Sequence, residues 1–113
     1  MATDKDVRFF EEVLTKTRAG KIPWEPTANP SLFAAPLAGK FTLTISESIG
    51  DSYTNTEYEL ILKDSDARQL TGITNFHPNV SVVDIRDLYE SARRKALNVD
   101  AKIDSVLGEL EKL

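Results

Sequence analysis

The last third of the chain carries a regular apolar pattern, whose members follow one another at alternating steps of four and three residues. Because an α-helix has 3.6 residues per turn, this spacing keeps all of them on one stripe of a helix. We call this set the apolar ladder, and it consists of Ile85, Tyr89, Ala92, Ala96, Val99, Ile103, Val106, Leu110 and Leu113. The pattern predicts a C-terminal helical region whose apolar face is long enough to call for a partner.

Two interpretations of this region stay open, one long helix or two shorter ones. Asn98 tolerates the left-handed conformation that ends helices, and Asp100 is a good N-cap, so a break gives helices over 82–97 and 101–112. A single helix of roughly 30 residues is about 45 Å long. It would project from a domain whose radius of gyration is about 13 Å. The projecting part would expose Ile103, Val106, Leu107 and Leu110.

A first helix is predicted at the start of the chain. Val7, Phe10 and Leu14 fall on one face at helical spacing. Gly20 is a natural left-handed stop just beyond the last turn. The pattern therefore predicts a helix over 4–18.

Between the helical regions, apolar and polar residues alternate with the period of β-strands. Two prolines flank Trp24, which favours a short edge strand or an extended arm over 21–27 that tucks Trp24 against the core. Turns are expected at 38–40, 50–52 and 64–66, and strands over 31–37, 41–49, 56–63 and 68–74. The predicted fold is a single α+β domain over 1–113, with an N-terminal helix, an antiparallel meander of four to five strands and a C-terminal helical region.

Two segments together resemble a pattern in small bacterial proteins of unknown function. The first is Lys21-Ile22-Pro23-Trp24, a Lys-Ile-x-Trp segment, and the second is the Leu-Tyr-x-x-Ala-Arg-Arg run over 88–94. In those proteins a leading helix, a short meander and a closing helix follow one another. The resemblance implies the α+β outline and a bacterial or phage origin, and it carries no site residue over to this chain.

Composition narrows the function classes. The 113 residues are 41% hydrophobic and 28% charged, as in a soluble globular protein, and the net charge is −4. The acidic balance argues against a general nucleic-acid binder. The chain has no cysteine, no apolar run of membrane-spanning length and no signal-peptide pattern near its start. We therefore expect a cytoplasmic protein with no membrane partner.

Candidate catalytic groups are sparse. His77, the only histidine, lies in a turn-like loop without a nearby catalytic or metal-ligating companion in the sequence. The Asp64-Ser65-Asp66 segment resembles the start of a calcium loop, but Arg68 stands where an oxygen ligand is needed, so a hairpin turn is the favoured interpretation. We expect no enzymatic activity, no cofactor and no metal site.

A basic cluster offers a possible anion-binding surface on this acidic chain. It consists of Arg86, Arg93, Arg94 and Lys95. Such a cluster can contact phosphate. Glu90, however, stands three or four residues from three of these arginines, which is the spacing of ion pairs on a helix. A solvated, self-paired face is therefore favoured, and nucleic-acid binding through this face is the alternative function.

The sequence thus predicts a small non-catalytic module that binds a protein partner, with a second copy of the chain, as in a homodimer, among the candidates. The partner-binding residues are expected to be Trp24, Ile103, Val106, Leu107 and Leu110. Burial of several aliphatic side chains at ~25 cal/mol per Å2 would supply the energy of association.

Overall fold

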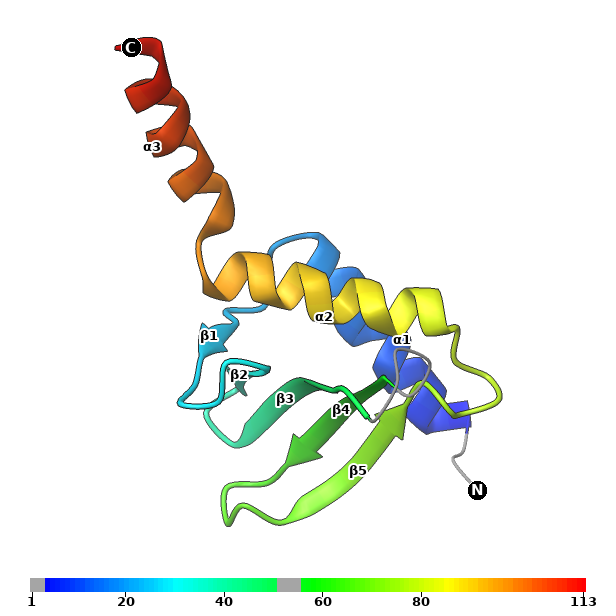
Figure 1. Ribbon diagram of the computed structural model, residues 1–113. Coiled ribbons are helices and arrows are strands. Elements are labelled where there is room, and N and C mark those ends of the chain that lie inside the picture. The colour runs from blue at the N-terminus through cyan, green and yellow to red at the C-terminus, as the bar shows by residue number, and fades with distance from the viewer. Residues whose placement is uncertain (1–3, 51–55) are drawn as a thin grey trace.

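The computed structural model describes residues 4–50 and 56–113 and shows the expected α+β architecture. A five-stranded antiparallel sheet carries two helices on one face, and a third helix projects away from this body (Figure 1). The elements are α1 (Asp4–Arg18), β1 (Glu25–Pro26), β2 (Leu32–Leu37), β3 (Phe41–Ser48), β4 (Glu57–Lys63), β5 (Gln69–Thr74), α2 (Val82–Ala96) and α3 (Val99–Glu111).

The sheet is a simple meander in the order β1-β2-β3-β4-β5, so each strand pairs with its neighbour in the sequence. Ala38 and Gly39 adopt positive φ angles of 56° and 69° in the β2–β3 turn, at the position predicted for it. β1 contains Pro26 and lies at the edge, where a missing backbone N–H is tolerated. The strands β2 to β5 match their predicted ranges within one residue, whereas β1 occupies only Glu25–Pro26 of the predicted 21–27 segment. The turn expected at 50–52 falls mainly on residues 51–55, which lie outside the described residues.

The core lies between the sheet and the helices α1 and α2. Alternate residues of the central strands point into it, as the period-two pattern predicted. The largest fully buried side chains are Phe33, Leu43, Ile45, Leu60, Ile73, Ile85 and Leu88. The first half of the C-terminal ladder thus supplies Ile85, Tyr89 and Ala92 of α2 to this core, with Leu88 beside them, which is why α2 lies flat on the sheet (Figure 1).

The C-terminal region is broken into two helices at Asn98, which has φ 53° and ψ 46°. Of the two interpretations left open by the sequence, the broken helix is confirmed. α3 begins at Val99 rather than at 101, because the carbonyl of Asn98 already accepts the N–H of Lys102 at 3.2 Å. Asp100 therefore lies in the first turn of α3, where it forms an ion pair with Arg94 of α2 across the junction.

The left-handed residue at position 98 makes the angle between α2 and α3 sensitive to substitution. Left-handed backbone costs an alanine about 1–2 kcal/mol, and alanine also favours helix. We expect Asn98→Ala to shift the chain toward one continuous helix, whereas Asn98→Gly retains the break. Spin-label distances between α1 and α3, with labels at Lys5 and Glu111, measure this. Identical distance distributions in the two variants would contradict the prediction.

Candidate interaction surface on the terminal helix

α3 is a helix without a buried residue, in contrast to α2. Every residue from Asp100 to Leu113 is exposed, and the helix leaves the body at the Asn98 junction. The resulting molecule measures 56 × 37 × 25 Å with a radius of gyration of 15.6 Å, against about 13 Å for a compact chain of this length. Because α3 projects from the body, the second half of the apolar ladder is exposed to solvent.

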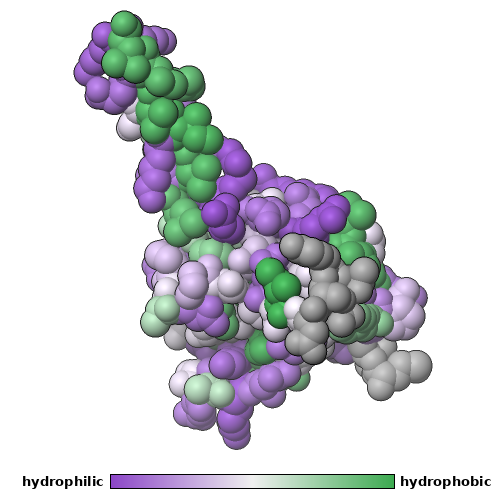
Figure 2. Space-filling model, in the orientation of Figure 1, coloured by the Kyte–Doolittle hydropathy of each residue, from purple (hydrophilic) through white to green (hydrophobic). Residues whose placement is uncertain are grey.

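An apolar face runs along the whole of this projecting helix, and Figure 2 shows it as a continuous green band. We call it the α3 stripe, and it consists of Ile103, Val106, Leu107, Leu110 and Leu113. Ile103 is 44% exposed, Leu110 55% and Leu113 fully exposed. Single exposed aliphatic residues are ordinary on protein surfaces, but a contiguous apolar patch on one face marks an interaction site.

Two apolar hollows lie along the stripe. One, at the base of the helix, is lined by Leu97, Val99, Lys102, Ile103, Val106 and Leu107. The other, at the tip, is lined by Ser105, Val106, Glu109, Leu110 and Leu113. Both hollows are flanked by one charged residue, Lys102 at the base and Glu109 at the tip. Side chains of a partner can therefore pack into hollows along the α3 stripe. The charge at its border is positive at the base of the helix and negative at the tip.

Within the described residues, few interactions stabilise α3 as a helix in the single chain. It has 13 residues, no side-chain cap at its N-terminus, no basic residue in its last turn and a glycine at position 108. Isolated helices shorter than ~12–15 residues are marginal in water, and a glycine in the interior costs about 1 kcal/mol relative to alanine. A partner that covers the α3 stripe would supply the stabilisation that the helix lacks.

The structure places Trp24 away from this surface. Trp24 is 3% exposed and belongs to the core, and its indole N–H donates to the hydroxyl oxygen of Thr17 at 3.0 Å. The expectation that Trp24 binds a partner is therefore corrected, because its side chain is buried in the core of the same chain. The prediction that the 21–27 segment tucks Trp24 against the core is confirmed.

The structure also divides the basic cluster. Burial raises the pKa values of Tyr58 and Tyr89, and the charges of the nearby Arg86 and Arg93, seven residues apart on α2, oppose a small part of that rise. Arg94 and Lys95 instead line a hollow at the junction of α1, α2 and α3. The four residues therefore fall into two pairs, one near the buried tyrosines and one at the junction of the helices.

The ion pairs of this region also differ from those expected. Among the ion pairs within the described residues, Arg94 pairs with Asp100 and none includes Glu90. Arg18 of α1 pairs with Asp84 at 3.7 Å and with Asp87 at 2.7 Å. The charged residues of α2 thus pair with residues of α1 and α3. Sequence spacing along α2 alone does not indicate such pairs.

A buried aromatic cluster connects the sheet to α2. The ring of Tyr89 lies 5.7 Å from that of Phe33 and 5.6 Å from that of Tyr58, in tilted geometry. Burial, followed by a hydrogen bond to the carboxylate of Glu47 and the charge of that carboxylate, raises the pKa of Tyr58 to about 12. Burial likewise raises the pKa of Tyr89. Both phenols are therefore neutral at pH 7, and sequence reasoning had not singled out Glu47.

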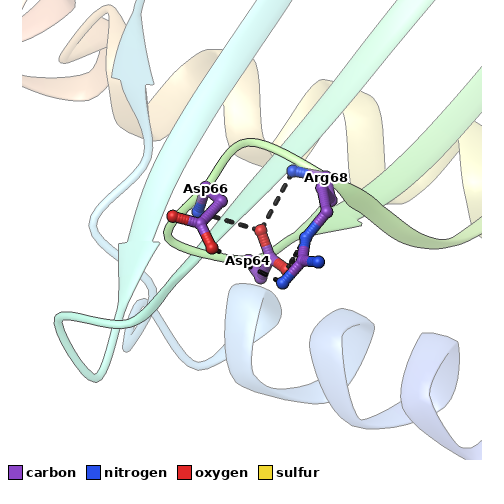
Figure 3. A network of polar contacts seen from close by, with 3 residues as sticks. All are labelled: Asp64, Asp66 and Arg68. Atoms are coloured by element: carbon purple, nitrogen blue, oxygen red, sulfur yellow. Dashed lines mark hydrogen bonds and ion pairs between the residues drawn. The ribbon is translucent and has the colours of Figure 1, made fainter.

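The Asp64-Ser65-Asp66 segment forms the hairpin turn between β4 and β5, as predicted (Figure 3). Asp64 Oδ1 accepts the backbone N–H groups of Asp66 at 2.9 Å and Arg68 at 3.0 Å, while Arg68 Nε donates to Oδ2 at 2.9 Å. The backbone hydrogen bond from Arg68 is the largest of the effects that lower the pKa of Asp64. The carboxylate is thus engaged in shaping the turn.

His77 lies in the loop before α2, where its Nδ1 accepts the backbone N–H of Asn79 at 3.0 Å. Within residues 4–50 and 56–113, no group of three or more His, Asp or Glu side chains gathers in a metal-binding arrangement. In the same ranges, no helix is both long and apolar enough to cross a lipid bilayer.

Comparison with protein-family models, with curated proteins and with solved structures finds no match. The resemblance to small bacterial proteins therefore stays a prediction. The feature of this chain that bears on function is the α3 stripe, an apolar surface along a projecting helix.

Proposed function

We propose that this protein works by binding a protein partner through the α3 stripe, and that the partner is a second copy of the chain. The observation that carries the proposal is the exposure of a whole apolar helix face on an element without a buried residue. Covering a fully exposed Leu, Ile or Val is worth about 1.5–3 kcal/mol, and roughly half of that for side chains that are half covered already. Several such residues act together on α3.

A second copy is the occupant that best fits the stripe. A two-fold symmetric dimer presents the same patch on both subunits, so the patch must complement itself. The α3 stripe is purely aliphatic, and its border carries one cation and one anion, Lys102 and Glu109. A surface with both signs of charge along its border can pair with itself, whereas a border of one sign would repel a second copy.

Sedimentation velocity over a range of protein concentrations tests this proposal with the variant Leu110→Asp. We expect the wild-type chain to form a dimer of twice its 12.6 kDa mass, and Leu110→Asp to remain a monomer at the same concentrations. The physical reason is that association would have to bury two carboxylates without partners. Because Leu110 is half exposed in the single chain, the body should stay folded, which circular dichroism checks.

Ala101→Asp is the matched control, since it adds the same charge to the same helix. Position 101 lies on the face opposite the stripe, as the 100° step per residue requires. This variant should dimerise as the wild type does. A wild-type chain that stays monomeric at the highest soluble concentration, or an equal loss of dimer in both variants, would overturn the proposal.

A further inference from the structure

We infer that the two copies of α3 pair in antiparallel orientation, with Ile103 of one copy opposite Val106 of the other. This inference rests on the proposed self-association and specifies its geometry. It is carried by the spacing of the stripe, by the charges along its border and by the position of the body at one end of the helix.

The second half of the apolar ladder has the spacing of a helix–helix seam. Val99, Ile103, Val106, Leu110 and Leu113 follow at steps of four, three, four and three residues. A repeat averaging 3.5 residues keeps one line of side chains facing a partner helix. In an antiparallel pair centred between Asp104 and Ser105, Ile103 faces Val106 of the second copy, and Val99 faces Leu110 of the second copy. Each of these contacts occurs twice.

The charges along the seam favour this orientation over the parallel one. Lys102 and Glu109 are seven residues apart and flank the same side of the stripe. The antiparallel register brings Lys102 against Glu109 of the second copy, and the symmetry repeats the pair. In a parallel pair Lys102 would instead lie beside Leu107 of the second copy, which offers no opposite charge for an ion pair. Charged residues in these flanking positions are known to set partner orientation.

Both charges are available for such pairs. Lys102 takes part in no ion pair within the described residues. Glu109 is 3.3 Å from the amine of Lys112, but both side chains are about three-quarters exposed, so this contact is weak and readily exchanged. The expected contribution of the new pairs is mainly to orientation, because exposed ion pairs add little affinity.

The placement of the body agrees with antiparallel pairing. α2 and the sheet lie at the N-terminal end of α3, so antiparallel helices put the two bodies at opposite ends of the seam (Figure 1). The same register carries Leu113, which is fully exposed in one chain, just past the first residue of α3 in the second copy, to the base of that helix. There the half-buried Leu97 borders the apolar hollow at the base of α3. The tip of each helix would thus cover the base of the other.

Because the chain has no cysteine, disulfide trapping reports the orientation directly. In an antiparallel pair, position 110 of one copy lies beside position 99 of the other and about 17 Å along the axis from position 110 of that copy. A disulfide needs Cα atoms about 5.5–6 Å apart. We expect an oxidised mixture of Val99→Cys and Leu110→Cys to give a covalent dimer containing both variants, and neither variant to cross-link efficiently alone.

Charge reversal provides a second test that leaves the apolar stripe intact. Lys102→Glu should weaken the dimer at least fivefold, because it places two pairs of carboxylates in contact. The double variant Lys102→Glu with Glu109→Lys should return the dissociation constant to within about threefold of wild type. Asp104→Lys is the control for adding a lysine to α3. The 100° step per residue places position 104 on the face away from the seam, so this variant should change the dissociation constant little.

The outcomes separate this inference from the proposal beneath it. Efficient cross-linking of Leu110→Cys with itself, together with no rescue in the double charge variant, would establish a dimer through α3 with parallel helices and overturn the inference alone. A monomeric wild type would overturn both. Heterotypic cross-linking with charge rescue supports both.

Discussion

Replacing Leu88 with alanine is expected to lower the free energy of unfolding by about 2–5 kcal/mol, whereas the same replacement at Leu110 should lower it by less than about 1 kcal/mol. Leu88 is fully buried between α2 and the sheet, so its truncation removes apolar contacts and leaves a cavity. Leu110 is 55% exposed and makes no core contact, so truncation leaves no cavity in the single chain.

The measurement is urea denaturation at a concentration low enough for the wild type to be monomeric. Both substitutions remove the same atoms from C-terminal helices, so each serves as the control for the other. At high concentration the roles should reverse, with Leu110→Ala weakening the dimer and Leu88→Ala leaving it intact wherever the variant is folded. Equal destabilisation of the monomer by the two variants would show that α3 packs on the body.

The second large effect is expected at alkaline pH and arises from Tyr58. Its pKa is about 12 in the folded chain and 10.0 in the absence of neighbours. Because burial and the Glu47 carboxylate disfavour the phenolate, the folded state retains a proton that the unfolded state releases first. The contribution of this site to stability is therefore complete below pH 10 and declines as the pH rises toward 12. By pH 11.5 the loss should be on the order of 2 kcal/mol.

Tyr58→Phe isolates this contribution, because phenylalanine keeps the ring that contacts Tyr89 and carries no ionisable group. Urea denaturation at pH 9 and pH 11.5 should show a larger loss of stability in the wild type than in this variant. The other ionising groups, Tyr89 among them, act in both proteins and cancel in the comparison. Equal losses in the two proteins would contradict the proposed environment of Tyr58.

Local pattern predicted the elements well, because periodicity and turn chemistry act over a few residues. The first helix was predicted over 4–18 and α1 spans Asp4–Arg18. The hairpin turns at 38–40 and 64–66 were recognisable from glycine and aspartate at suitable positions, and the structure has turns there. Asn98 likewise signalled the helix break, since its short polar side chain tolerates the left-handed backbone.

The candidate site was predicted only in part. The exposed aliphatic residues of α3 were indicated by their spacing, but spacing alone did not say which half of the ladder lies on the sheet. The two prolines around Trp24 favoured a place against the core, but the same residue was also expected to bind a partner. Its contact with Thr17 depends on how 19–24 folds back on α1. The ion pair between Arg94 and Asp100 depends on the angle between two helices, which the sequence pattern does not specify.

By itself, then, the sequence determined the order and type of the helices and strands and the length of the apolar ladder, because these follow from interactions between residues a few positions apart. Only the tertiary structure decided that the ladder is divided, with Ile85 and Ala92 inside the core and Ile103 and Leu110 in solvent. The physical reason is that burial depends on which surfaces meet in space. The sheet is covered by α1 and α2, and a single left-handed residue then directs α3 away from it.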